Sequence, residues 1–428
     1  MSSTVHFALN DEQKMIQQLA RDFARNEMAP VAEHYDQTHE YPWPVIKKAQ
    51  ELGLTTLNVP EEYGGLGLSL FEECMVAEEL AWGCSGMSTA MGVNGLAILP
   101  ILIGGSEAQK KEYCGRLVDG QMASYGLTEP EAGSDVAGIK TTARKEGDHY
   151  ILNGSKTFIT GATVANFFTV FAYTDIAQRY NGMSCFVVER DWEGVSVGQP
   201  FNKMGQHASD TAELIFDNVK VPATHLLGEE GKGFLIAMKV FDRSRPPTSA
   251  GAVGVAQRAL DEAIRYAKER VVKGQPIWKH QVIGHMIADM AMEGLAAAGL
   301  LNRSTRVLVI GAGASPLVFR LTGEVGDVFA VDDYLGSRAC YPEMLLQPGV
   351  MTSLAFEPAR LHVSHAVGLP LRQVDESFDA VIVLDSASLL QDRSGTAAAL
   401  LEELHRVLKP DGVLSITFDL ILNGPPDR

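Results

Sequence analysis

The chain has 428 residues, of which 46% are hydrophobic and 21% are charged, and its formal net charge is −17. This balance is typical of a folded multidomain protein and excludes disordered and fibrous classes. The acidic charge disfavours nucleic acid and anionic lipid, so we expect neither a nucleic-acid nor a membrane partner. No apolar run approaches the roughly 20 residues of a membrane span, and the N-terminus lacks a signal or transit pattern, which predicts a cytoplasmic protein.

Residues 10–120 are predicted to be helical. Met15, Leu19 and Phe23 recur every four residues and so define one apolar face of a helix. Asn10 or Asp11 is a suitable N-cap for that helix. We therefore expect an N-terminal helical domain over residues 1–121.

A middle β-domain is predicted over residues 122–230, followed by helices over 231–302. Segments rich in β-branched and aromatic residues predict four strands, at 149–160, 166–174, 183–191 and 211–222. The helical pattern after Gly231 is interrupted at 273–278, where KGQPIW contains glycine and proline.

The composition changes near residue 302. The first 302 residues contain 15 Lys and 11 Arg, whereas the remainder contains one Lys and nine Arg. From Arg306 onward, strands are predicted within RVLVIGAG (306–313), DVFAVDD (327–333), FDAVIVLDS (378–386) and GVLSITFD (412–419), and a helix at TAAALLEELHRVL (396–408). This alternation predicts a parallel Rossmann-like α/β sheet over 303–428. The five cysteines form no Cys-x-x-Cys pair and are odd in number, so we expect free thiols rather than a zinc or disulfide site.

The loop in YGLTEPEAGSDVAGIKT (125–141) is the most informative local feature. Gly126 and Gly133 allow a ligand to approach the backbone, while Thr128 and Ser134 offer hydroxyl groups. Such a loop suits the edge of a planar ring or a phosphate, although an ordinary polar loop has the same composition.

Residues 5–295 resemble the acyl-CoA dehydrogenase family, and the medium-chain type in particular. The resemblance rests on YGLTEPEAGSDVAGIKT and on further motifs in the same order, which are MAPVAEHYD (28–36), PEEYGGLGL (60–68), LNGSKTFIT (152–160), FDNVKVP (216–222), GEEGKGF (228–234), RPPTSAGAVGVAQRALDEA (245–263) and HQVIGHMIADMAM (280–292). It implies a multidomain α+β fold with a helical domain, a β-domain and a partial helical bundle. It also implies FAD-dependent oxidation of an acyl-CoA to the 2,3-enoyl-CoA, with electrons passing to an electron-transferring flavoprotein.

The resemblance assigns residues to the cofactor and to the substrate. Those expected at FAD are Tyr125, Gly126, Leu127, Thr128, Glu129, Gly133, Ser134, Phe158, Ile159, Thr160, Arg270, His280 and Gln281. Those expected at the acyl-CoA are Ser134, Asp242, Arg243, Ser244 and Arg245. In the family, the arginine that matches Arg270 reaches the FAD of a neighbouring subunit, so the resemblance implies a homo-oligomer. The helices that build the family's assembly have no counterpart in this sequence.

No catalytic residue is assigned, because the base is missing. The chemistry needs a carboxylate beside C2 of the thioester. In most of the family this glutamate lies in a YEGTSQ-like motif, which the chain does not contain, and in some relatives it lies at the position of Ser244. Asp242 is rotated about 200° from Ser244 around a helix and so faces elsewhere. We therefore expect a dehydrogenase segment that is truncated and impaired.

Residues 306–420 resemble the class I S-adenosylmethionine-dependent methyltransferases. VLVIGAGAS (307–315) joins a strand to a helix, and Asp332 ends the next strand. The resemblance implies that Gly311 and Gly313 approach the methionine part of S-adenosylmethionine and that Asp332 binds its ribose. The domain also lacks the closing strands of the family.

Three functions remain open from the sequence. The first is an impaired acyl-CoA dehydrogenase-like flavoprotein, the second is a methyltransferase with an N-terminal scaffold, and the third is a catalytically inactive fusion. Acyl chain length and methyl acceptor are not determined by these motifs.

Overall fold

A computed structural model describes residues 9–297, 306–310, 327–332, 361–365, 378–383 and 406–416. The chain divides into two compact units, of which one comprises Leu9–Arg258 and the other comprises Met1–Ala8 with Ala259–Arg428.

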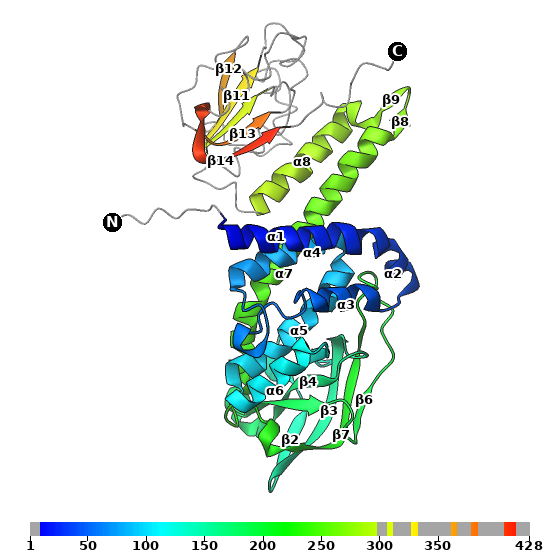
Figure 1. The fold of residues 1–428 in the computed structure, drawn as a ribbon, viewed down its shortest axis with the longest axis vertical. Helices are drawn as coiled ribbons and strands as arrows, with labels where there is room; N and C mark the ends of the chain where they lie inside the picture. Colours follow the sequence, from blue (N-terminus) through cyan, green and yellow to red (C-terminus); the bar gives the residue numbers. More distant parts are fainter. Residues whose placement is uncertain are drawn as a thin grey trace, which may run out of the picture. The chain divides into compact units, whose positions relative to one another are not determined.

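Helices α1 to α6 form the N-terminal part of the Leu9–Arg258 unit (Figure 1). They span Asp11–Phe23, Ala32–Thr38, Trp43–Glu51, Leu70–Gly83, Ser85–Gly104 and Glu107–Val118. The predicted cap at Asn10 is confirmed, since its side chain accepts a hydrogen bond from the Gln13 amide while the Gln13 side chain accepts one from the Asn10 amide.

Helix α5 corrects the expectation that no apolar segment has the length of a membrane span. By length and composition alone, Ser85–Gly104 is long and apolar enough to cross a membrane, and it is the one helix of this kind among the described residues. Gly, Ser and Thr interrupt its apolar residues, so the sequence shows no uninterrupted apolar run of this length. Met91, Ile98 and Ile101 on this helix are fully buried inside the unit, so α5 serves as a core helix.

A seven-stranded sheet follows in chain order. Its strands β1 to β7 span Ala123–Gly126, Thr142–Glu146, His149–Thr160, Phe167–Tyr173, Met183–Glu189, Val195–Val197 and Thr211–Pro222. The order is β1-β4-β2-β3-β7-β6, and β5 pairs with β4. All four predicted strands are present, and β3 and β7 have the predicted bounds.

The core of this unit lies between the helices and the sheet. One buried cluster joins α5 and α6 to β1, β4 and β5, through residues such as Ile98, Tyr113 and Phe167. The same cluster includes Ile236 and Val240 near the start of α7, which spans Gly233–Glu269. The β1–β4 edge is therefore packed rigidly, and it is the edge from which the candidate flavin loop leaves.

Helix α7 packs closely against α4. Gly251 and Gly254 bring its backbone next to α4, where a Cβ on Gly254 would collide with the Glu78 carbonyl and lie 3.1 Å from the Trp82 amide nitrogen. Arg258 places its guanidinium carbon 4.5 Å from the centre of the Trp82 ring. These contacts hold the middle of α7 against α4, and residues 242–245 lie in the first half of the same helix.

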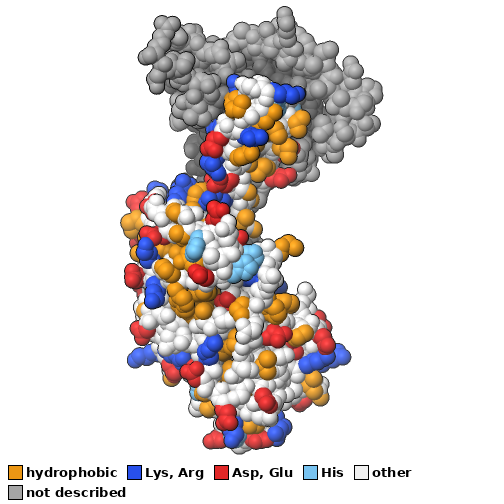
Figure 2. Space-filling view, turned by 90° about the vertical axis from the view of Figure 1, so that its right-hand side faces the viewer, with side chains coloured by type: hydrophobic (Ala, Val, Ile, Leu, Met, Phe, Trp, Pro, Cys, Tyr) orange, Lys and Arg blue, Asp and Glu red, His pale blue; other side chains and the backbone are white. Residues whose placement is uncertain are grey.

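The other unit contains the end of α7, a short hairpin and α8. Strands β8 (Val271–Val272) and β9 (Gln275–Pro276) pair around Lys273 and Gly274, whose φ values of 51° and 78° suit a tight hairpin turn. Helix α8 spans Gln281–Ala297, and Figure 2 shows hydrophobic side chains on the surface of this helical region. Val282 and Met286 on α8 are 69% and 58% exposed.

The same unit contains a five-stranded parallel sheet. Strands β10 to β14 span Arg306–Ile310, Asp327–Asp332, Leu361–His365, Phe378–Val383 and Leu408–Ile416. Their order is β12-β11-β10-β13-β14, with every neighbouring pair parallel. The strands predicted within 306–313 and 378–386 therefore share one sheet, as expected. The predicted helix at 396–408 lies outside the described residues except for its last three positions.

The expectation of free thiols is confirmed for four cysteines. Cys74, Cys84, Cys114 and Cys185 are unpaired, and the last two are buried. Burial raises the pKa of the Cys114 thiol to about 11 and that of Cys185 further, so both are poor nucleophiles at neutral pH. Cys340 lies outside the described residues.

Candidate functional site

The loop after β1 is held at its base by β3. The Thr157 amide donates to the Thr128 carbonyl at 2.9 Å, and the Lys156 ammonium donates to the Leu127 carbonyl at 3.1 Å. The loop then turns tightly, because the amides and carbonyls of Glu129 and Ala132 exchange two hydrogen bonds. Residues 127–134 are thus a fixed loop that lies beside residues 157–160.

Several polar groups of this loop and of the end of β3 have no hydrogen-bond partner among the described residues. Thr128 and Thr160 are half-buried, whereas Gly133 and Ser134 are exposed. Within the described part of the chain, the Thr128, Ser134 and Thr160 hydroxyls and the Gly133 amide make no hydrogen bond. A Cβ built on Gly133 meets no atom within 4 Å, so the space beside it is open. These groups are free to bind a ligand.

Phe158 supplies an exposed aromatic ring next to these donors. It is 65% exposed, and its ring centroid lies 5.3 Å from that of Phe201. Its φ of 56° places it in the left-handed region at a bulge between Lys156 and Ile159. A bulge re-aims a strand side chain, and a non-glycine residue in this region is strained and often marks a functional site.

Four of the predicted cofactor residues direct their side chains into the protein. Tyr125 packs its ring 5.2 Å from that of Phe171, and Leu127 and Ile159 are buried in the core. The Glu129 carboxylate accepts hydrogen bonds from the Lys156 ammonium at 2.7 Å and from the Thr141 hydroxyl at 2.5 Å. These residues can contact a ligand at this loop only through their backbone.

Lys156 and Thr141 are parts of this site that the motifs did not single out. Lys156 is fully buried, yet in the sequence it stands as one charge in an otherwise strand-like segment. That isolated charge could have identified Lys156 in the sequence, since a lysine inside a buried strand needs a hydrogen-bonding or charged partner.

The predicted substrate residues lie in the first half of α7. Asp242 and Arg245 are exposed, Ser244 is half-buried, and the Arg245 guanidinium carbon lies 5.1 Å from the centre of the Phe241 ring. Arg243 instead donates to Glu73 of α4 at 2.9 Å. Burial raises the pKa of Glu73, with Arg243 opposing this shift. Glu73 is a carboxylate that the sequence motifs did not single out.

Arg270, His280 and Gln281 belong to the other unit. Arg270 is exposed before the β8–β9 hairpin, His280 precedes α8, and Gln281 is the first residue of α8. Among the described residues the His280 Nε2 atom is buried and has no hydrogen-bond partner. Their assignment to FAD remains a prediction from the resemblance.

The second predicted site lies at the parallel sheet. Strand β11 ends at Asp332, and Asp332 is in register with His365 at the end of β12. Gly311 and Gly313 lie outside the described residues. The carboxyl ends of β10 and β11 are neighbours in the sheet, which is where nucleotide-like ligands bind in open α/β sheets.

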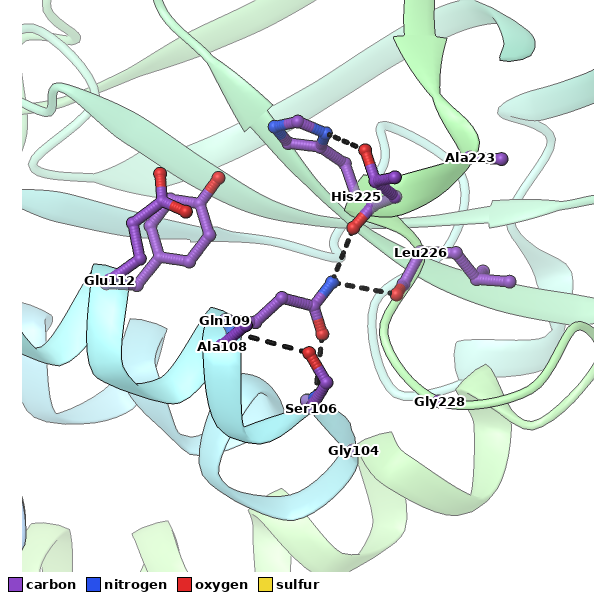
Figure 3. Close-up of a pocket in the computed structure, with 12 residues that line it drawn as sticks. Gly104, Ser106, Ala108, Gln109, Glu112, Ala223, His225, Leu226 and Gly228 are labelled. Carbon is purple, nitrogen blue, oxygen red and sulfur yellow. Dashed lines mark hydrogen bonds between the residues drawn. The ribbon is translucent and has the colours of Figure 1, made fainter. Parts of the chain in front are cut away.

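A separate hollow of about 620 Å³ lies between the start of α6 and residues 223–228 (Figure 3). Its main polar groups are already hydrogen-bonded to one another, because the side-chain amide nitrogen of Gln109 donates to the backbone carbonyls of Thr224 and Leu226. Burial lowers the pKa of His225, which leaves its ring neutral at neutral pH. We therefore assign the candidate site to the loop at 127–134.

Comparison with known families agrees with this architecture. Three acyl-CoA dehydrogenase profiles match in order, the N-terminal domain at residues 10–121, the middle domain at 124–219 and the C-terminal domain at 231–316. A methyltransferase domain profile matches residues 308–416. The chain belongs to the acyl-CoA dehydrogenase family of oxidoreductases and carries a methyltransferase-like region after it.

Individual relatives cover most of the chain. The probable medium-chain specific acyl-CoA dehydrogenase 2 of Caenorhabditis briggsae, a mitochondrial protein, is 41% identical over 67% of this chain and 71% of its own. The structure of butyryl-CoA dehydrogenase from Megasphaera elsdenii is 40% identical, with a TM-score of 0.66 over 69% of this chain and 79% of its own. An acyl-CoA dehydrogenase from Bacillus anthracis, solved in complex with FAD, is 39% identical, with a TM-score of 0.64 over 68% of this chain and 50% of its own.

Proposed function

We propose that the Leu9–Arg258 unit binds FAD and an acyl-CoA as an oxidoreductase of impaired activity. The observation that carries the proposal is the open loop at 127–134, whose unpaired donors lie beside the exposed Phe158 ring. The crystallised FAD complex of a relative supports the same cofactor.

The residues at this loop fit a flavin. The isoalloxazine ring has a polar edge and a flat apolar face, so it needs hydrogen-bond donors next to an aromatic surface. Thr128, Ser134 and Thr160 offer hydroxyl groups, Gly133 leaves room for close approach, and Phe158 offers a ring. FAD bound here would accept a hydride from C3 of the acyl-CoA while a base removes a proton from C2.

The proposed impairment rests on the proton acceptor, because this sequence has no carboxylate at the positions where the family places its base. Ser244 is neither charged nor basic enough to take a proton from C2. The Glu129 carboxylate is engaged by Lys156 and Thr141, and Glu73 is engaged by Arg243. We infer that the unit binds and orients its ligands but transfers the C2 proton poorly.

The remaining assignments follow the family resemblance. The electron acceptor would be an electron-transferring flavoprotein. A cytoplasmic location does not follow from the resemblance and stays a prediction from the sequence. Arg270 would serve the FAD of a second copy, so full FAD affinity would require a homo-oligomer.

A steric block at Gly133 tests the flavin site. Gly133→Leu places a side chain where no protein atom lies within 4 Å, so the fold should tolerate it. We expect it to fill the space of the flavin and to raise the Kd for FAD at least roughly tenfold, a change of about 1.4 kcal/mol. Fluorescence titration of flavin-free protein with FAD measures this change.

The matched control is Gly115→Leu, because a Cβ on Gly115 also meets no atom within 4 Å and the residue belongs to α6 rather than to the loop. It should leave the Kd for FAD unchanged. Equal FAD binding by the Gly133→Leu variant and the wild type would exclude this loop as the flavin site.

We also propose weak S-adenosylmethionine binding at the parallel sheet, without methyl transfer. The observation in favour is the strand order β12-β11-β10-β13-β14, with Asp332 at the carboxyl end of β11. An acid at this position suits the ribose hydroxyls. A methyltransferase with an N-terminal scaffold, or a fusion without activity, remains the alternative to the oxidoreductase.

Asp332→Ala should abolish S-adenosylmethionine binding in isothermal titration calorimetry, because it removes the ribose acceptor. The neighbouring variant Asp333→Ala controls for the loss of one negative charge. Equal heats for Asp332→Ala and the wild type would remove Asp332 from the site.

A further inference from the structure

Lys156 is a fully buried lysine directly beneath the candidate flavin loop. Its ammonium donates to the Leu127 carbonyl at 3.1 Å and to Glu129 Oε1 at 2.7 Å. It lies on β3 two residues before Phe158, at the bulge that turns the Phe158 ring outward. One side chain therefore connects the start of the loop to the strand that presents the ring.

Glu129 extends this connection to the far end of the loop. Its Oε2 atom accepts from the Lys140 amide at 2.6 Å, and its Oε1 atom accepts from the Thr141 amide at 3.0 Å and the Thr141 hydroxyl at 2.5 Å. The loop that leaves at Leu127 and returns at Thr141 is thus closed by a single carboxylate. A Cβ on Gly154 would lie 2.6 Å from the Thr141 hydroxyl, so a glycine is required where β3 passes this point.

A buried ion pair of this kind is poor evidence for a role in stability alone. Desolvating two charges offsets most of their attraction, and apolar replacements of similar volume are often as stable. Burial lowers the pKa of Lys156 to about 8, so at neutral pH it is still protonated beside the Glu129 carboxylate. What the charged pair supplies, and an apolar pair does not, is a set of directed hydrogen bonds to one carbonyl and two amides.

We propose that Lys156 and Glu129 are positioning residues of the flavin site, which fix the loop so that Thr128, Gly133 and Ser134 face the ring edge. This inference rests on the proposed FAD site. The pair does not touch the cofactor and acts through the backbone of Leu127, Lys140 and Thr141. Loss of the pair should leave the unit folded with a mobile loop, and FAD affinity should fall.

The test uses the full chain and FAD as the probe. The double variant Lys156→Met/Glu129→Gln removes both charges together and so leaves no unpaired buried charge. We expect its Kd for FAD to rise at least roughly tenfold and the visible absorption band of bound flavin to shift. Thr141→Val, which removes only one hydroxyl, should weaken FAD binding in the same direction by a smaller factor and covers the case in which the double variant does not fold.

The control is the Arg116–Glu189 pair, in which Arg116 of α6 donates two hydrogen bonds, at 2.7 and 2.8 Å, to the carboxylate of Glu189 at the end of β5. Arg116→Met should lower the Tm and leave the Kd and flavin spectrum unchanged. Unchanged Kd and spectrum in both Lys156→Met/Glu129→Gln and Thr141→Val would overturn the positioning role while leaving the FAD site intact. A wild type that binds no FAD would overturn the proposed function and this inference together.

Discussion

Ser244→Glu should give measurable acyl-CoA dehydrogenase activity to a chain that, by the function proposed above, is nearly inactive. The substitution installs a carboxylate at the position on α7 that carries the base in some relatives. A positioned general base contributes about 10²–10⁴-fold to the rate, so we expect turnover with butyryl- to octanoyl-CoA to rise by that order. The measurement is steady-state reduction of an artificial electron acceptor by the FAD-loaded protein.

Two matched variants separate base catalysis from other effects. Glutamine has the same length as glutamate but no basic carboxylate, so Ser244→Gln should keep the wild-type rate. Asp242→Glu extends a carboxylate from an exposed position rotated about 200° around the helix, and it should also keep that rate. A wild-type rate that already equals that of Ser244→Glu would mean that the chain has a base elsewhere, with Glu73 the first residue to replace.

Gly254→Ala should strongly destabilise the Leu9–Arg258 unit. The new Cβ would collide with the Glu78 carbonyl and approach the Trp82 amide nitrogen to 3.1 Å, so α7 would have to move away from α4. Overpacking costs about 1–3 kcal/mol. Because the neighbour here is backbone that cannot rotate away, we expect the upper end, about 3 kcal/mol, which is more than a hundredfold in the unfolding equilibrium. Urea denaturation followed by circular dichroism measures the change in free energy.

Gly115→Ala is the control for this prediction. Gly115 lies inside α6, where a Cβ would meet no atom within 4 Å, so alanine there should stabilise the helix by up to about 1 kcal/mol. If Gly254→Ala and Gly115→Ala unfold at the same urea concentration, the prediction is wrong and α7 does not pack tightly against α4 at Gly254.

Local sequence patterns predicted much of the fold. The cap at Asn10 and the bounds of β3 and β7 follow from residue types within a few positions of each element. Strands β10, β11, β13 and β14 also follow from short apolar runs bounded by turn residues. Strand β12 was not predicted, because LHVSH alternates polar and apolar residues without a clear boundary.

The support of the candidate site was not predictable in the same way. The pairing of Lys156 with Glu129 joins residues 27 positions apart and depends on the pairing of strands in space. The outward turn of Phe158 depends on a bulge, which no residue in SKTFIT requires. The motifs included residues 127–134 and 158–160, which the structure places side by side, while the inward turn of Tyr125 and Glu129 emerged only from the packed structure.

Anaerobic mixing of the FAD-loaded wild type with octanoyl-CoA tests most directly whether the unit keeps a flavin and acyl-CoA site while lacking the base for proton removal. We expect the flavin absorption spectrum to be perturbed when the acyl-CoA binds. We also expect the oxidised-flavin band to persist during the time in which the flavin of Ser244→Glu is reduced. Rapid bleaching of the wild-type flavin, or a wild type that retains no flavin, would contradict this expectation.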